Sequence, residues 1–312
     1  MPTINPYLCS VIIPTLNAAD LLPTLLNSLC CQHLSRFAII VIDSGSEDRT
    51  VDIALSAGCC VHRIRKQDFN HGGTRNFGVF LAKGEIVVFM TQDTILSDAK
   101  ALQNIIRPFS DPKVGAVCGR QLPRKGANPL GAHARYFNYP STSSTKTKAD
   151  IPNMGIKVPF ISNSFAAYKK SVFNKLSGFP DDVIFGEDMC LAAKMVLSGY
   201  SIAYSGDACV YHSHNYTPIQ EFQRYFDIGV LHARKSWIQE SFGGPGDEGL
   251  RYIISELVYA HKHSWYWVIR SLVSCIAKFL GYKLGKMESG LPIRYKLWLS
   301  MNKNFWSNMK RF

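Results

Sequence analysis

Strand-length apolar segments alternate with helix-like segments through the first 120 residues, and this alternation limits the possible folds more than any other feature of the chain. The apolar runs are rich in β-branched residues, whereas the segments between them carry apolar residues at helical spacing. The expected strands are residues 8–14, 37–42, 59–64, 85–90 and 114–118. Because strands that alternate with helices form βαβ units, the pattern predicts an α/β fold with a mainly parallel central sheet.

The alternation stops at Gln121, where a segment rich in Pro, Gly and Ser runs to Pro159. We expect residues 121–159 to form a long loop, of the kind that often serves as a lid or an acceptor-binding segment. Helix-like and strand-like segments then resume, and basic, aromatic helices fill the end of the chain. The expected organisation is a catalytic domain over residues 1–217 and a helical region over residues 218–312.

The composition suits a folded protein whose positive charge is concentrated in the tail. Hydrophobic residues make up 46% of the 312 residues, enough to bury a core. Of the net charge of +12, residues 251–312 contribute +9, from 11 Lys and Arg against two acids. Nine cysteines without a CxxC motif favour a reducing compartment, and residues 1–6 do not resemble a signal peptide. We therefore expect an intracellular protein.

Polar residues follow three of the expected strands. Thr15 and Asn17 follow the first, Asp43 the second and Asp93 the fourth. Ligands of open parallel sheets bind beyond the carboxyl ends of the strands, so these residues predict a shared site. Asp43 could accept a hydrogen bond from a pyrimidine base; the alternative is that it only caps the next helix.

Two further motifs have the chemistry of a diphosphate and metal site. In His71-Gly72-Gly73-Thr74-Arg75-Asn76, Arg75 can bind phosphate oxygens and a helix N-terminus can bind an anion; a plain glycine-rich turn is the alternative. Asp93, at the end of Thr91-Gln92-Asp93, is a natural ligand for Mg²⁺ or Mn²⁺, unless it only caps a helix. His212 and His214 alternate along an extended segment, so both can face one metal, although most such histidines are structural.

Glu187 and Asp188 are adjacent acids at the start of an expected helix. In this position a carboxylate can serve as the general base that deprotonates an acceptor hydroxyl. The alternative is that both acids only favour the helix dipole.

Together these motifs resemble the inverting glycosyltransferases of family two, which have the GT-A nucleotide-sugar-binding fold. The matching residues are Ser10-Val11-Ile12-Ile13-Pro14-Thr15-Leu16-Asn17, Asp43-Ser44-Gly45-Ser46-x-Asp48, Gly72-x-Thr74-Arg75-Asn76, Gln92-Asp93 and Glu187-Asp188. Phe69-x-His71-Gly72-x-Thr74-Arg75-Asn76 with Thr91-Gln92-Asp93 is similar to bacterial rhamnosyltransferases of O-antigen and capsule assembly. The resemblance covers roughly residues 8–217.

The resemblance implies a role for each matching position. Donor-binding residues would be Thr15, Asn17, Asp43, His71, Arg75 and Gln92. Asp93 stands where the family's metal-binding DxD motif ends, with Thr91 in place of the first Asp, so the cation would also depend on His212 or His214. Asp188 stands at the position of the catalytic base, with Glu187 beside it. The implied reaction is one direct displacement from dTDP-L-rhamnose onto a polyprenyl-diphosphate-linked sugar.

The tail predicts contact with a membrane surface. Apolar residues recur at helical spacing among basic ones, which is typical of interfacial helices. The residues concerned are Trp265, Val268, Ile269, Leu272, Ile276, Phe279 and Leu280, with Lys262, Arg270, Lys278, Lys283 and Lys286 beside them and Trp298 and Trp306 further on. We expect a peripheral protein at the cytoplasmic face of the inner membrane. The alternative is that these helices pack on the core or on a second subunit.

Three other functions are compatible with parts of the sequence. A family-two enzyme could use another donor and transfer galactose, mannose or N-acetylglucosamine, because no residue pattern defines the sugar pocket. A nucleic-acid-binding protein could use the basic tail alone, but the acidic motifs would then have no role. The chain could also be an inactive partner subunit, although it retains the acids that catalysis needs.

Overall fold

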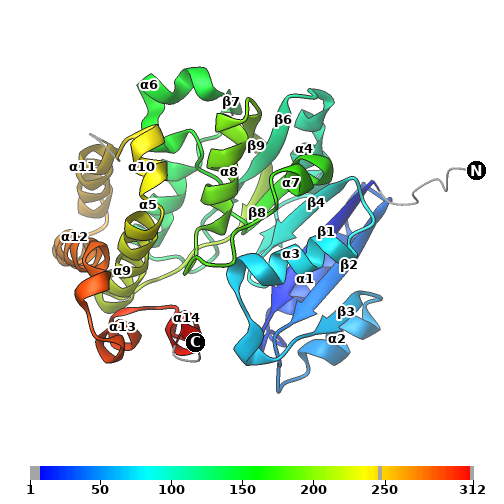
Figure 1. Cartoon of the computed structure of the whole chain (residues 1–312), viewed down its shortest axis with the longest axis horizontal. Helices are drawn as coiled ribbons and strands as arrows, with labels where there is room; N and C mark the ends of the chain where they lie inside the picture. Colours follow the sequence, from blue (N-terminus) through cyan, green and yellow to red (C-terminus); the bar gives the residue numbers. More distant parts are fainter. Residues whose placement is uncertain (1–7, 245–247, 310–312) are drawn as a thin grey trace, which may run out of the picture.

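A nine-stranded mixed sheet forms the centre of the molecule in the computed structural model, which describes residues 8–244 and 248–309 (Figure 1). The expectations for residues 1–6, and for Lys310 and Arg311 of the basic tail, lie outside these residues. The strands are β1 Cys9–Thr15, β2 Phe37–Asp43, β3 Cys60–Arg63, β4 Ile86–Met90, β5 Ile95–Leu96, β6 Val114–Leu122, β7 Ser144–Lys146, β8 Phe165–Lys169 and β9 Ser201–Tyr211. Their order is β3-β2-β1-β4-β8-β6-β9-β5, and β7 pairs with β9.

The predicted α/β fold is confirmed, with one refinement of the sheet. Strands β1 to β4 pair in parallel, as does β6 with β9. Strand β8, which the sequence pattern did not predict, runs antiparallel between β4 and β6. The parallel register of β1 and β2 sets Thr15 opposite Asp43, so both strands end at the same edge.

Helices cover both faces of the sheet, because central strands such as β1 and β4 carry buried apolar side chains on both sides. One buried cluster joins the sheet to α1, α2 and α4, and another joins it to α3, α7 and α8. The α-helices are α1 Leu22–Cys30, α2 Thr50–Ser56, α3 His71–Leu81, α4 Ala101–Ile106, α5 Pro129–Asn138, α6 Ile151–Met154, α7 Lys170–Lys175, α8 Glu187–Leu197, α9 Pro218–Arg234, α10 Ser236–Phe242, α11 Glu248–His261, α12 Trp265–Lys286, α13 Ile293–Leu299 and α14 Lys303–Met309. Short 3₁₀ helices span Lys66–Asp68, Arg107–Ser110, Lys148–Asp150, Gly155–Lys157 and Glu288–Gly290.

The segment 121–159, expected as a long loop, carries more regular structure than its composition indicates. It contains the end of β6, α5, β7 and α6. The side chain of Asn128 caps α5 by accepting a hydrogen bond from the Gly131 N–H at 2.8 Å. The helical region expected from residue 218 begins with two helices, because the chain leaves the helical conformation at Lys235, between α9 and α10.

Helices α9 and α12 pack so closely that glycines form the contact. A Cβ atom on Gly281 would lie 2.3 Å from the carbonyl oxygen of Phe222, and one on Gly285 would lie 2.0 Å from that of Phe226. On α9, a Cβ atom on Gly229 would lie 2.4 Å from the carbonyl oxygen of Tyr282. Small residues at such spacing allow two helix backbones to approach, as they often do in membranes.

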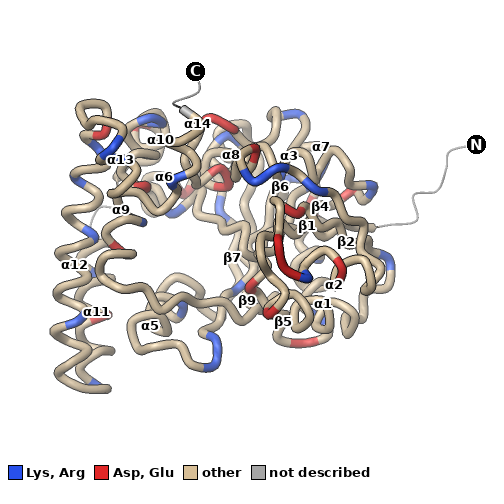
Figure 2. The backbone as a smooth tube through the Cα atoms, turned by 90° about the horizontal axis from the view of Figure 1, so that it is seen from below, with Lys and Arg blue, Asp and Glu red and all other residues tan. Residues whose placement is uncertain are grey.

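The large apolar side chains of α11 and α12 face outward as a consequence. We call them the outer face; its members are Leu250, Ile254, Val258, Trp265, Tyr266, Ile269, Leu272, Val273, Ile276, Phe279 and Leu280, each at least 46% exposed. Figures 1 and 2 show both helices side by side along one edge of the molecule, away from the sheet. In the described part of the chain, no helix has the length and hydropathy needed to cross a bilayer.

Three residues counted with the basic, aromatic face lie elsewhere. Lys278 faces inward, 3.7 Å from both Glu221 and Glu256. Arg270 is half-buried and donates to the carbonyl oxygen of Tyr216, whereas Trp306 is fully buried. Helical spacing does not show which side of a helix packs inward. The inner side of α12 packs against the protein through ion pairs and close backbone contacts, and an apolar pattern does not reveal these.

Candidate functional site

The ends of β1, β2 and β4 lie together, as the sequence predicted. The Thr15 hydroxyl donates to the Asp43 carboxylate at 3.2 Å, and both side chains are buried. The Gln92 side chain bridges to the first strand: its Oε1 accepts from the Leu16 N–H at 2.8 Å, and its Nε2 donates to the Leu16 carbonyl at 3.2 Å. Gln92 therefore fixes the loop after β1 against the loop after β4.

Asn17 and Asp43 organise the loops that follow β1 and β2 and join them to each other. Asp43 Oδ2 accepts from the N–H groups of Gly45 and Ser46 at 3.1 and 2.9 Å, which stabilises the turn after β2. Asp43 does not cap the next helix, because α2 begins at Thr50 and its N-cap residue is Arg49. Asn17, in the left-handed region at φ 47°, donates its N–H to the Ser46 hydroxyl and accepts from the Glu47 N–H. The roles of Asp43 and Asn17 toward a nucleotide stay predictions.

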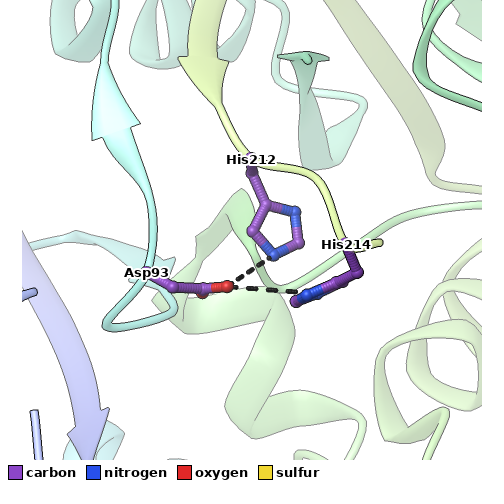
Figure 3. Close-up of side chains that lie close together, drawn as sticks. All are labelled: Asp93, His212 and His214. Carbon is purple, nitrogen blue, oxygen red and sulfur yellow. Dashed lines mark ion pairs between the residues drawn. The ribbon is translucent and has the colours of Figure 1, made fainter. Parts of the chain in front are cut away.

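Asp93, His212 and His214 converge in the arrangement expected of metal ligands (Figure 3). The Nε2 atoms of His212 and His214 lie 3.3 and 3.9 Å from Asp93 Oδ2. All three ligand atoms lie within 4.8 Å of one another. Both imidazoles point toward the carboxylate, so the alternation of His212 and His214 along the chain does place them on one side.

Hydrogen bonding defines which nitrogen of His212 faces this group. His212 Nδ1 lies 2.9 Å from Gln121 Oε1, which also accepts a bond from Arg135. Because that oxygen can only accept, Nδ1 carries a proton, and Nε2 is the nitrogen that faces Asp93. A cation or a proton between Nε2 and the Asp93 carboxylate satisfies both groups.

The titration of the group suits a cation at neutral pH. Burial raises the pKa of Asp93, but the hydrogen bond and charge of His212 outweigh it and hold this pKa far below its usual range. Burial and the neighbouring His212 lower the pKa of His214 to about 4. Asp93 is therefore ionised and His214 neutral at pH 7, the forms that bind metals.

Glu187 and Asp188 form a second cluster around Asn163. The Asn163 N–H donates to Asp188 Oδ2 at 3.0 Å, and its side-chain amide donates to Glu187 Oε1 at 2.9 Å. The Tyr168 hydroxyl donates to Asn163 Oδ1 at 2.9 Å, which orients the amide. Arg75 lies 3.3 Å from Glu187 Oε1, and both side chains are buried. Arg75 therefore has an acidic partner inside the protein.

The two acids have opposite pKa shifts. For Glu187, burial raises the pKa, but the charge of Arg75 and the hydrogen bond from Asn163 lower it, and the net shift is downward. For Asp188, burial and the negative charge of Glu187 raise the pKa to about 7. A carboxylate with a pKa near the working pH is well matched to accept a proton from a hydroxyl, so Asp188 has the properties of a general base.

The glycine motif has a different role from the one expected. Asn70 Oδ1 accepts from the N–H groups of Gly72 and Gly73, both at 2.9 Å, so these donors are already engaged. A Cβ atom on Gly72 would lie 1.9 Å from the Pro180 carbonyl oxygen. Gly72 therefore allows α3 to contact the loop that leads to Glu187, and it does not present its N–H to an anion.

His71 connects the acidic cluster to the end of the chain. Its carbonyl oxygen accepts from Arg75 at 3.0 Å, and its Nε2 lies 3.1 Å from Asn302 Oδ1. Burial lowers the pKa of His71, which favours the neutral imidazole. The Nε2 atom then donates to Asn302.

Sequence reasoning missed the partners that orient these groups: Asn163, Tyr168, Gln121 and Asn302. Asn163 and Gln121 are polar residues at the borders of apolar runs, which is a weak signal. Asn302 lies 231 positions from His71, so sequence spacing could not indicate the contact.

Comparison with known proteins identifies the sequence relatives. Residues 10–177 match the family model described as Glycosyl transferase family 2. The chain is 51% identical, over 303 residues covering 96% of each chain, to "O-antigen chain rhamnosyltransferase RfbN" of Salmonella typhimurium. It is also 51% identical to "O-antigen chain rhamnosyltransferase WbaN" of Salmonella anatum, over 87% of each chain.

Solved structures with the same fold are more distant in sequence. The mannosyltransferase PcManGT from Pyrobaculum calidifontis, solved with GDP-Man and Mn²⁺, has a TM-score of 0.58 at 19% identity, over 97% of this chain and 86% of its own. TarS 1–349 of S. aureus with UDP has a TM-score of 0.52 at 18% identity, over 91% and 92%. These likenesses agree with the GT-A fold.

Proposed function

The chain belongs to glycosyl transferase family 2, and on this premise we propose that it moves L-rhamnose from dTDP-L-rhamnose to a polyprenyl-diphosphate-linked sugar in O-antigen assembly. One observation carries the choice of sugar and pathway: the 51% identity to an O-antigen chain rhamnosyltransferase over almost the whole of both chains. The motifs shared with that family and the geometry around Asp188 support the reaction class.

The proposed reaction is a single displacement with inversion. The acceptor hydroxyl attacks the anomeric carbon of rhamnose from the face opposite the diphosphate. The new C–O bond forms as the bond to the diphosphate breaks, and dTDP leaves with the electron pair. The Asp188 carboxylate accepts the hydroxyl proton, for which its pKa of about 7 is suited.

Glu187 serves a different purpose in this proposal. Its carboxylate already accepts from Asn163 and pairs with Arg75, so it is not available as the base. Its charge raises the pKa of Asp188, and its ion pair positions Arg75 and, through the Arg75–His71 contact, the start of α3. Arg75 and His71 remain our candidates for contact with the donor.

Asp93, His212 and His214 fit a divalent cation, because the Nε2 atoms of the two histidines lie 3.3 and 3.9 Å from Asp93 Oδ2 and all three ligand atoms lie within 4.8 Å of one another. Two imidazoles and one carboxylate suit Mn²⁺ at least as well as Mg²⁺, which prefers an all-oxygen shell. When bound, the ion would neutralise charge that develops on the leaving diphosphate. The protein that shares this fold and holds GDP-Man with Mn²⁺ supports the pairing of metal and donor.

The neighbouring loops would hold the thymine base and the deoxyribose. Thr15, Asn17 and Asp43 lie at the ends of β1 and β2, at the edge where open α/β sheets bind ligands. Gln92, which bridges the loops after β1 and β4, would fix this edge next to Asp93. We assign the donor to this edge.

The outer face of α11 and α12 supports association with a membrane surface. Exposed apolar patches of this extent are uncommon on monomeric soluble proteins. The inner side of the same helices carries Ser271, Ser274 and Glu256, all buried. Three exposed basic residues, Arg251 on α11, Lys262 in the turn after it and Lys283 on α12, can interact with anionic lipids. We place the enzyme peripherally at the cytoplasmic face of the inner membrane, with a lipid-linked acceptor in reach.

A thermal-shift panel tests the donor assignment. The full chain is incubated with dTDP, UDP, GDP and their sugars, with and without Mn²⁺, because a ligand of the native state raises the unfolding temperature. We expect the largest rise with dTDP-rhamnose plus Mn²⁺. A rise with UDP or GDP sugars alone would replace rhamnose with galactose, N-acetylglucosamine or mannose and leave the reaction class intact.

A further inference from the structure

A cavity of about 520 Å³ lies between the start of α3, the loop before α8 and the C-terminal segment. Its volume falls within the usual range for small-ligand pockets. It is lined by Phe69, Asn70, His71, Asp181, Asp182, Ile184, Arg234, Met301, Asn302, Lys303, Asn304, Phe305 and Asn308. Figure 1 shows α13 and α14 turning back from α12 toward the sheet, which brings the last of these residues to the cavity.

The C-terminal wall of the cavity is held by specific bonds. Asp227 Oδ2 accepts from the N–H groups of Met301 and Asn302, both at 3.1 Å, and from the Asn302 side chain at 2.9 Å. Asn302 contacts His71, and Asn308 donates to the Gln67 carbonyl at 2.8 Å. The wall is therefore attached to both the helical region and the sheet domain.

The lining has the chemistry of a site for a neutral polar ligand. Two acids and two bases line it, and two of these are engaged: Arg234 with Glu288 at 2.7 Å, and Asp182 with Lys235 at 2.6 Å. The balanced charge does not favour a phosphate. The remaining side chains, Asp181, Lys303 and Asn304, are exposed and offer both acceptors and donors.

Two aromatic rings complete the lining. Phe69 packs edge-on against His71, with ring centroids 5.1 Å apart, and Phe305 lies under the Arg234 guanidinium at 5.3 Å. Apolar rings beside a few placed polar groups are typical of pockets that orient a small ligand. A pyranose matches this combination, because it has an apolar C–H face and a rim of hydroxyls.

The cavity adjoins the catalytic cluster on two sides. His71, in its wall, contacts Arg75, which pairs with Glu187. The loop that contributes Asp181 and Ile184 continues directly into Glu187 and Asp188 at the start of α8. A sugar in this cavity would be next to the elements that hold the general base.

We propose that this cavity is a pyranose-binding subsite, which the C-terminal segment completes and which receives a sugar of the acceptor glycan. Assigning that sugar to the acceptor rests on the proposed function, whereas binding of a pyranose does not. Asp181 and Asn304 bind the hydroxyls, and Phe69 and Phe305 pack against the ring.

The test is direct binding, without donor or turnover. The full chain is titrated with the methyl glycosides of glucose, galactose, mannose and rhamnose and observed by saturation-transfer NMR. We expect at least one glycoside to bind. The double variant Asp181→Ala/Asn304→Ala should raise the Kd for that glycoside at least about tenfold. This is the effect of losing about 1.4 kcal/mol of hydrogen bonding.

A matched control uses the same changes on the opposite part of the sheet domain. Asp52→Ala/Asn27→Ala alters exposed residues of α2 and α1 and should leave glycoside binding unchanged. The inference is overturned if no glycoside binds the wild-type chain, or if Asp181→Ala/Asn304→Ala binds as the wild type does. The dTDP thermal shift, measured on the same samples, reports separately on the proposed function.

Discussion

The sheet and helix α12 use apolar residues in opposite ways. In β1 and β4 the large side chains face inward, and Ile12, Ile13 and Phe89 are completely buried. In α12 the large side chains face outward: Trp265 is 69% exposed and Ile276 is 61% exposed. The sheet is stabilised by burial of apolar area, whereas α12 is attached through glycine contacts and buried polar groups.

This difference suggests a division of tasks. The sheet positions the candidate catalytic groups, which need a rigid frame. The large apolar side chains of α12 face outward and are free to contact another medium, which we propose is the membrane. Variants in the two regions should therefore fail in different assays, and the following predictions test that separation, starting with the largest effect.

Removing the proposed base should abolish transfer without affecting membrane contact. Asp188→Asn preserves the size of the side chain, but its single oxygen can accept from only one of the Asn163 and Met189 N–H groups. Because the amide cannot accept the hydroxyl proton, the rate should fall about 10²–10⁴-fold. Rhamnosyl transfer is measured together with dTDP binding and vesicle sedimentation, both of which should stay within a few fold of wild type. Unchanged turnover would remove Asp188 as the base.

Removing the metal ligand should affect donor binding and rate but again not membrane contact. Asp93→Ala takes away the carboxylate that faces both imidazoles, so transfer should fall about a hundredfold. In thermal shift, Mn²⁺ should no longer add to the stabilisation by dTDP. Asp52→Ala, on exposed α2, is the matched control. An undiminished effect of Mn²⁺ in Asp93→Ala would place the ion elsewhere.

Charging the outer face should have the reverse effect. Ile276→Glu/Phe279→Glu removes two exposed apolar side chains, so partition onto vesicles of phosphatidylglycerol and phosphatidylethanolamine should fall about a hundredfold. The free energy of unfolding should change by less than about 0.5 kcal/mol, because both sites are on the surface.

The inward side of the same helix supplies the contrasting variant. Gly281→Leu would push a side chain into the Phe222 backbone and should destabilise the fold by about 1–3 kcal/mol or more. Denaturant unfolding compares it with Ile276→Glu/Phe279→Glu. Full vesicle binding by the charged variant would contradict the membrane assignment.

The smallest effect is the pH dependence of the rate. Because the pKa of Asp188 is raised to about 7, its carboxylate is ionised above that value and protonated below it. Activity should therefore fall as the pH decreases, about tenfold between pH 8 and pH 6. His214, with a pKa of about 4, stays neutral over this range, so protonation of His214 does not contribute. A flat profile would contradict a base with this pKa.

The candidate site was predicted well where it depends on the ends of single strands. Apolar runs followed by Thr15, Asp43 and Asp93 indicated the edge of the sheet, because parallel strands end on one side. The alternation of His212 and His214 also carried enough information, since extended segments repeat every two residues.

Prediction was weakest where distant segments meet. The glycines of the His71 motif suggested an anion cradle, but Asn70 engages their donors and Gly72 contacts Pro180. Lys278 and Trp306 had the spacing of an exposed face yet lie inside, because α9 and α11 surround Lys278 and residues of α9 and α13 pack with Trp306. Motifs and residue spacing along the chain cannot predict such contacts between distant segments.

The sequence by itself determined the α/β class, the strand ends that carry Thr15, Asp43 and Asp93, and the outward amphipathic pattern of α12. These depend on periodicity and on neighbours along the chain, which the residues encode locally. Only the tertiary structure decided that Asn163 joins Glu187 to Asp188, that Gln121 orients His212, and that Asn302 closes a cavity beside His71. Such contacts form only when packing brings segments that are distant in the sequence within hydrogen-bond distance, and local sequence patterns do not encode that distance.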